Sequence, residues 1–217
     1  MWLNDGSGQF TDSGQLLNPN LADYLGLTLG DVAGDNDVDA FIPGFGNTPL
    51  WLNQGNGLFS NSSQTFASLW DPTLTDIDND GDLDAYVANC HGSGNDKLWL
   101  NDGQGQFSDS GQTIDGLCSY EADFGDVVGD GDLDVSWSDR DTKTLRWSEN
   151  TGGGAFGAAG SLSMAGIGTV RDLDNDGLVD LVVANHAGDP LERGDNRAGL
   201  VTATHQEHPR EISKGAL

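Results

Sequence analysis

The sequence predicts an all-β fold: a β-propeller built of four-stranded antiparallel blades, with four repeats of about 48 residues. Two motifs, an aromatic turn motif and an aspartate-rich loop motif, alternate along the chain and are each present in four copies. No segment has the apolar periodicity of an amphipathic helix. Short strands marked by periodic glycine and aromatic residues are typical of propeller blades.

The aromatic turn motif reads Trp-Leu-Asn-x-Gly-x-Gly-x-Phe. It begins at Trp2, Trp51 and Trp99, and a looser copy with one extra residue runs from Trp147 to Phe156, so the tryptophans are 49, 48 and 48 residues apart. The Trp-Leu-Asn segment is expected to form a strand, the glycines a turn with positive φ, and the residues after the phenylalanine a return strand. Because the tryptophans occupy the same position in every repeat, we interpret them as packing between blades rather than as a ligand cage.

The aspartate loop motif follows the pattern D-x-D-x-D-G-x-x-D. It starts at Asp31, Asp76, Asp126 and Asp172, at intervals of 45, 50 and 46 residues. An apolar segment precedes each copy and another follows it, as at residues 85–88. Together with the two strands of the aromatic turn motif, these segments predict four strands in each repeat.

The two ends of the chain differ from the repeats between them. The chain begins at a tryptophan strand, so its first two strands could complete a blade begun by the last two and close a ring of four. The alternative, which we slightly prefer, is an open arc. Residues 1–187 hold 30 acids and 5 bases, whereas residues 188–217 hold 5 acids and 4 bases. Residues 1–187 are therefore predicted to form the repeats, and residues 188–217 a divergent or loosely ordered tail.

Each aspartate loop offers oxygen atoms at regular positions. Carboxylates stand at positions 1, 3, 5 and 9, a glycine at position 6 allows a sharp turn, and position 7 offers its backbone carbonyl. Hard cations take about 6 to 8 such oxygens, an arrangement that suits Ca²⁺ better than Mg²⁺. The loop is not an EF-hand, because its twelfth position is an apolar residue in every copy: Ile42, Val87, Trp137 and Val183. No cluster of cysteine and histidine competes for zinc.

The two motifs together resemble the FG-GAP and VCBS-type repeats of integrin-like β-propellers, over residues 2 to about 187. The resemblance implies up to four bound Ca²⁺. The second and fourth loops are complete; their ligands are Asp76, Asp78, Asp80, Asp84 and the carbonyl of Asp82, and Asp172, Asp174, Asp176, Asp180 and the carbonyl of Leu178. The first and third loops are expected to bind more weakly, because position 3 is Ala33 and Val128, and position 6 of the first loop is Asn36. Their remaining ligands are Asp31, Asp35, Asp39 and the carbonyl of Asp37, and Asp126, Asp130, Asp134 and the carbonyl of Asp132.

The charge of the chain favours cations as partners. It carries 35 acidic and 9 basic residues, for a net charge of −26, and four Ca²⁺ would change this to −18. A surface this negative repels nucleic acid and anionic lipid, and no run of ~18 apolar residues predicts membrane insertion. Without metal, neighbouring loop carboxylates repel each other by roughly 1 kcal/mol per pair even at the dielectric constant of water. We therefore expect calcium to contribute to the stability of the fold.

No motif of a known catalytic type is present, neither a G-x-S-x-G elbow, a phosphate-binding glycine loop nor H-E-x-x-H, so we expect no enzyme. The resemblance implies a calcium-binding module for extracellular recognition or cell adhesion. Its protein or glycan ligand is unidentified, and self-association could complete the propeller. The alternatives are a lectin-like carbohydrate-binding propeller and an accessory propeller of a larger secreted enzyme.

A need for calcium predicts an extracellular or cell-surface location, although no signal peptide follows Met1. Cys90 and Cys118 could form one disulfide or remain free thiols. The histidines are expected to be solvated loop residues: His91, His186, His205 and His208.

Overall fold

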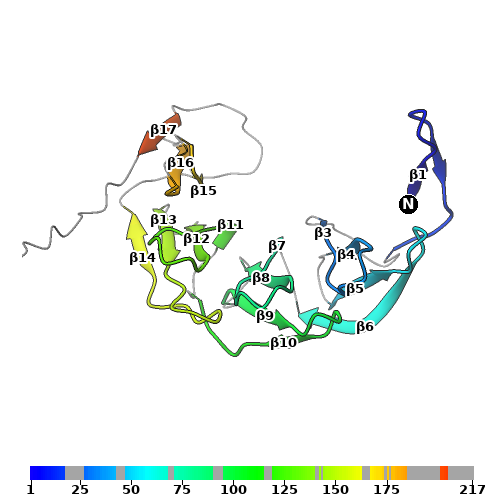
Figure 1. The fold of residues 1–217 in the computed structure, drawn as a ribbon, viewed down its shortest axis with the longest axis horizontal. Coiled ribbons are helices and arrows are strands. Elements are labelled where there is room, and N and C mark those ends of the chain that lie inside the picture. The colour runs from blue at the N-terminus through cyan, green and yellow to red at the C-terminus, as the bar shows by residue number, and fades with distance from the viewer. Residues whose placement is uncertain are drawn as a thin grey trace, which may run out of the picture.

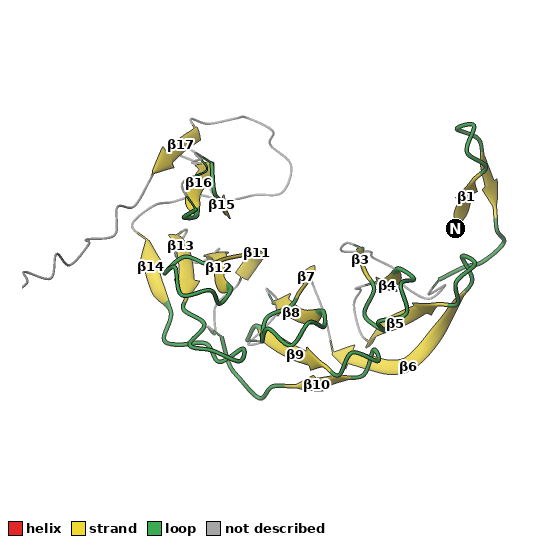
Figure 2. Cartoon of the chain, in the orientation of Figure 1, coloured by secondary structure: helices red, strands yellow, loops and turns green. Residues whose placement is uncertain are grey.

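In the computed structural model of this 217-residue chain, the described residues form only strands and loops (Figures 1 and 2). The described residues are 1–17, 27–42, 47–67, 71–89, 95–114, 119–139, 142, 144–162, 167–173, 175, 177–184 and 201–204. Among them, no helix has the length and apolar character needed to cross a membrane. The prediction of an all-β fold is confirmed. The two cysteines and all four histidines lie outside the described residues.

Within this part of the chain the strands form five antiparallel sheets. The first is a hairpin of β1 (Trp2–Asn4) and β2 (Phe10–Asp12). The second contains β3 (Thr28–Gly30), β4 (Asp39–Phe41), β5 (Asn47–Asn53) and β6 (Phe59–Ala67). The third contains β7 (Asp71–Thr75), β8 (Asp84–Ala88), β9 (Lys97–Asn101) and β10 (Phe107–Asp109). The fourth contains β11 (Ser119–Gly125), β12 (Asp134–Asp139), β13 (Thr144–Ser148) and β14 (Gly160–Leu162), and the fifth β15 (Ile167–Arg171), β16 (Asp180–Ala184) and β17 (Val201–Thr204).

The second, third and fourth sheets share one topology. Their four strands are hydrogen-bonded in chain order, with an aspartate loop between the first and second strands and an aromatic turn between the third and fourth. In the third sheet, Ala85 of β8 is the register partner of Trp99 in β9. These three sheets confirm the predicted four strands per repeat and their order.

The sheets follow one another along an open arc (Figure 1). The hairpin β1–β2 lies at one end of the arc, and β15–β17 lie at the other. Strands β3, β7, β11 and β15 line the inner side and contact each other in that order, whereas β6, β10 and β14 lie on the outer side. The ends of the arc do not meet in this structure.

Apolar cores fill the spaces between neighbouring sheets. Between the second and third sheets, the ring of Phe66 packs edge-on against Trp99, with centroids 5.0 Å apart, and against Phe107. Trp99 therefore packs between sheets, as the sequence predicts. The same prediction is wrong for Trp2, whose side chain is 65% exposed. Trp99 packs against Phe66 of the sheet before its own, whereas the hairpin β1–β2 is the first sheet of the described residues, so Trp2 has no preceding sheet there to pack against.

One strand lies in the segment for which the sequence predicts a divergent or loosely ordered tail. Residues 201–204 form β17, which pairs with β16 from Leu181 opposite Thr204 to Ala184 opposite Val201. The rest of residues 188–217 lies outside the described residues.

Candidate metal centre

The aspartate loops are held in shape by their own carboxylates. In the second loop, Asp76 accepts the backbone N–H groups of Asp80 and Gly81 at 3.1 and 3.0 Å, and Asp80 accepts that of Asp82 at 3.0 Å. The first and third loops form the same three hydrogen bonds at 2.8 to 3.2 Å. The loops therefore adopt one conformation whether or not position 3 carries a carboxylate.

Positions 4 and 6 of every loop have positive φ. Position 6 is Asn36, Gly81, Gly131 and Gly177, with φ of 69°, 97°, 95° and 90°. Position 4 is Gly34, Asn79, Gly129 and Asn175, with φ of 67°, 63°, 78° and 61°. The loop motif predicts a turn only at position 6, although glycine and asparagine, which tolerate this φ best, occupy both positions in all four loops. Asn36 therefore preserves the turn in the first loop.

The ninth position is a buried aspartate that ties the loop to the neighbouring strand. Asp84 accepts the N–H of Ile77 with Oδ2 at 3.0 Å and the N–H of Asn101 with Oδ1 at 2.9 Å. Asp39 and Asp134 form the equivalent pairs in the first and third loops. In the fourth loop, Asp180 accepts the N–H of Leu173 at 3.0 Å.

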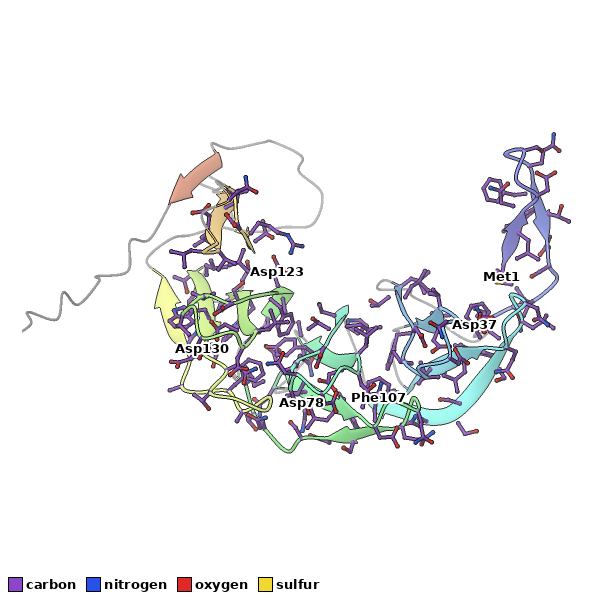
Figure 3. All side chains as sticks on the ribbon, viewed as in Figure 1. Met1, Asp37, Asp78, Phe107, Asp123 and Asp130 are labelled. Atoms are coloured by element: carbon purple, nitrogen blue, oxygen red, sulfur yellow. The ribbon has the colours of Figure 1, made fainter. Side chains whose placement is uncertain are left out.

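Three carboxylates converge in the second loop. Asp76, Asp78 and Asp84 each present an oxygen atom, and these atoms lie within 4.8 Å of one another. No other such group of three occurs among the residues that the structure describes. Figure 3 labels Asp78 in this loop, with Asp37 and Asp130 in the loops of the neighbouring sheets. A donor set made only of carboxylate oxygens fits a hard cation such as Ca²⁺.

The other loops differ from this arrangement at position 3. Ala33 and Val128 leave the first and third loops without the third converging carboxylate. In the fourth loop, Asp172 accepts the N–H of Gly177 at 3.1 Å, as Asp76 does for Gly81. The remaining carboxylates of the fourth loop, Asp174 and Asp176, lie outside the described residues.

The motif predicts that position 7 offers its carbonyl as a ligand, and the side chain of this residue in addition contacts the aromatic turn. The Asp82 carboxylate lies against Gly103 of the aromatic turn, so closely that a Cβ on Gly103 would overlap it. Asp37 lies against Gly55 in the same way, with its Oδ2 2.8 Å from where a Cβ would be. The first glycine of the aromatic turn has a positive φ, which favours glycine, and a side chain there would also displace this carboxylate.

Burial raises the pKa of Asp84 to about 6, and the negative charges of Asp78 and Asp80 add to the effect. Burial also raises the pKa of Asp39 and of Asp134, and burial together with the charge of Asp80 raises the pKa of Asp78. The ionised form of these carboxylates is therefore unfavourable in the folded protein, and the positive charge of a bound cation would offset this unfavourable free energy.

We expect the calcium-depleted protein to lose stability as the pH rises from about 4 to about 6. Asp84 has a pKa of about 6 when folded and about 3.8 when unfolded, so the folded state binds more protons in this range, and stability falls with pH. The urea midpoint at each pH measures the effect. The Asp84→Asn variant, which cannot titrate here, is the control and should have a flatter profile. A midpoint that rises over this range would contradict the expectation.

The asparagine of the aromatic turn motif connects the loops of adjacent sheets. The side-chain nitrogen of Asn101 donates to the carbonyl of Val32 in the first loop at 2.9 Å and to that of Leu83 in the second at 3.0 Å. Asn150 connects the second loop to the third in the same way, through Ile77 and Leu133. Sequence reasoning missed this role, although the asparagine is present in every copy of the motif.

A glutamine provides a second connection between sheets. The Gln15 side chain donates to the carbonyl of Phe59 at 2.6 Å and accepts its N–H at 3.1 Å. Gln64 and Gln112 likewise accept the N–H of the phenylalanine in the next aromatic turn, but they donate to the carbonyl of the glycine two residues before it, 41 to 44 residues further along the chain. The signal that sequence reasoning missed is a third repeat, Asp/Asn-Ser-Gly/Ser-Gln, at residues 12–15, 61–64 and 109–112.

A comparison with protein families finds a match in the central part of the chain. Residues 76–137 match the model of the FG-GAP-like repeat. This segment is an FG-GAP-type repeat. It contains the second and third aspartate loops and the aromatic turn between them, so the resemblance noted in the sequence is confirmed there. No curated protein matches this chain.

Two solved structures share a distant likeness with it. One is a lectin from Agrocybe aegerita, described as recognising non-reducing terminal N-acetylglucosamine, with 20% identity and a TM-score of 0.46 over 81% of this chain. The other is a Tc holotoxin pore from Photorhabdus luminescens, with 19% identity and a TM-score of 0.40 over 78% of this chain. The chain spans 50% of the first protein and 8% of the second.

Proposed function

We propose that the chain is a calcium-binding, non-enzymatic β-propeller module for extracellular recognition or cell adhesion. The observation that carries the proposal is the convergence of Asp76, Asp78 and Asp84 in the second loop. In the proposed site these carboxylates bind Ca²⁺ together with Asp80 and the carbonyl of Asp82. Extracellular calcium, at ~10⁻⁴–10⁻³ M in the range of weak loop sites, would keep such a site occupied outside the cell.

The same chemistry is proposed for the other loops at different strengths. The fourth loop carries the full set of aspartates at positions 1, 3, 5 and 9, so we place a second strong site there. The first and third loops share the backbone conformation of the second but have one carboxylate fewer. Each missing carboxylate lowers the affinity for Ca²⁺, so these two loops are assigned the weaker sites.

The propeller part of the proposal rests on how the sheets repeat. Three four-stranded sheets with strands in chain order pack face to face, with their first strands on the inner side of an arc. Blades of a propeller have this topology and this radial order of strands. A module of this kind presents many loops on a rigid frame, which suits the recognition of a partner surface.

A calcium titration of loop variants tests the proposal. Isothermal titration calorimetry on Asp78→Ala, which gives the second loop the position 3 residue of the first, should show the loss of one strong site. The reverse change, Ala33→Asp, should add one, because the first loop already has the required backbone conformation. Asp12→Asn removes one negative charge outside the loops and should leave the number of strong calcium sites unchanged. We expect this variant to fold, since Asn61 occupies the same position in the next repeat. Absence of calcium-dependent heat in the unaltered protein would refute the proposal.

A further inference from the structure

Asn79, at position 4 of the second loop, forms a hydrogen bond with the next loop. Its side-chain nitrogen donates to the carboxylate of Asp132, at position 7 of the third loop, at 2.7 Å. The first and third loops have glycine at position 4, Gly34 and Gly129, so they have no side chain that could form this bond. Asn79 has a φ of 63°, a conformation that is more favourable for glycine than for asparagine. The hydrogen bond to a charged acceptor offsets this difference.

Two further contacts join the second loop to the fourth sheet. At position 2, the carbonyl of Ile77 accepts the side-chain N–H of Asn150 at 2.9 Å. At position 3, the Cβ of Asp78 lies 3.4 Å from where a Cβ on Gly154, in the aromatic turn of the fourth sheet, would be. Positions 2, 3 and 4 therefore all contact the fourth sheet, and the converging carboxylate of Asp78, labelled in Figure 3, belongs to the middle residue of this segment.

The first loop meets the third sheet with fewer contacts. Asn101 donates to the carbonyl of Val32 at position 2, and at position 3 the Cβ of Ala33 is 3.8 Å from where a Cβ on Gly105 would be. Position 4 contributes no side chain to this junction. In the sequence, asparagine at position 4 and aspartate at position 3 occur together, in the second and fourth loops. The additional contact thus accompanies the complete set of carboxylates.

We propose that Asn79 is a positioning residue of the calcium site, through which calcium binding in the second loop and docking of the fourth sheet favour each other. The inference rests on the proposed function, because it concerns the regulation of the same site. With the Asn79 hydrogen bond in place, the segment that carries Asp78 has less conformational freedom to lose when calcium binds, so the affinity is higher. A coupling of binding free energies is reciprocal, so bound calcium in turn stabilises the junction between the third and fourth sheets.

Calcium titration calorimetry of the Asn79→Gly variant tests the proposal. The variant gives the second loop the position 4 residue of the first and third loops, which have the same positive φ there, so we expect it to fold. It should raise the Kd of one strong calcium site about three- to tenfold, as expected for the loss of one exposed hydrogen bond. Asn36→Gly is the matched control, since it makes the same substitution in the first loop, at a position where the other loops carry glycine. It should leave the Kd of the strong sites unchanged.

Hydrogen exchange followed by mass spectrometry measures the reciprocal effect on the fourth sheet. Calcium should slow amide exchange in the aromatic turn of this sheet, residues 150–156, more than in the turn of the third sheet, residues 101–107, which lies against the first loop. In Asn79→Gly this difference should be smaller. If Asn79 had only a structural role, the variant would exchange faster to the same extent in calcium and in chelator, and its Kd would be that of the unaltered protein.

The acceptor of the hydrogen bond provides a second variant. Asp132→Ala removes the partner of Asn79 and keeps the backbone carbonyl at position 7. Adding Asn79→Gly to Asp132→Ala should not weaken calcium binding any further, because the bond is already absent. A further weakening would overturn the proposal, and so would an unchanged Kd in Asn79→Gly alone. Absence of calcium-dependent heat in the unaltered protein would refute the proposed function itself, so the two failures are distinguishable.

Discussion

Removal of calcium is expected to lower the thermal unfolding temperature by about 5 to 11 °C for each fully occupied loop. A ligand at a hundred times its Kd stabilises the folded state by ~2.7 kcal/mol, and for a protein of this size ~1 kcal/mol corresponds to ~2–4 °C. Bound calcium stabilises the fold because a divalent ion neutralises the like charges of Asp76, Asp78 and Asp84. Circular dichroism melts in millimolar calcium and in chelator measure the difference.

The Asp78→Ala variant is the matched control for this experiment. It removes one converging carboxylate but preserves the backbone hydrogen bonds that Asp76 and Asp80 make within the loop. Its melting temperature in chelator should be at least that of the unaltered protein, because one repulsive charge is gone, and its gain on adding calcium should be smaller. Equal melting temperatures of the unaltered protein in calcium and in chelator would contradict the expected role of the metal.

The order of strands in each sheet could be predicted because the two motifs alternate along the chain in a constant order and at a nearly constant spacing. The apolar segment at residues 85–88 follows the second loop, so it had to be the strand after the loop, and it forms β8. The carboxylate at position 9 was likewise visible as the last aspartate of the motif, although its burial was not predicted. Local spacing is enough in both cases, because the interacting residues lie within one repeat.

The contacts between sheets could not be predicted in the same way. Asn101 and Val32 are 69 residues apart, and nothing in either local sequence identifies the other as its partner. Trp2 and Trp99 stand in nearly identical motifs, yet Trp2 is 65% exposed and Trp99 packs against Phe66. Burial of a repeated residue depends on which sheet packs beside it, and the local sequence of a motif does not show whether such a sheet is present.

The Asn101→Ala variant is expected to lose about 2 to 6 kcal/mol of unfolding free energy, because it leaves two carbonyls without their donor, at ~1–3 kcal/mol for each buried unsatisfied group. These carbonyls belong to Val32 in the first loop and Leu83 in the second, and Asn101 itself is 6% exposed. Asn53→Ala is the control, since among the described residues its side-chain nitrogen donates only to the carbonyl of Val38, at 3.2 Å, and Asn53 is more exposed than Asn101. It should lose less than ~1 kcal/mol.

The two variants should also differ in how cooperatively the protein unfolds. Repeats that contact only their neighbours share stability through the bonds between them, so loss of a connecting bond allows adjacent units to unfold separately. Urea unfolding of Asn101→Ala should therefore have a lower m value as well as a lower midpoint, whereas Asn53→Ala should keep the m value of the unaltered protein. Equal effects of the two substitutions would mean that the asparagine acts within its own turn and does not couple the loops of adjacent sheets.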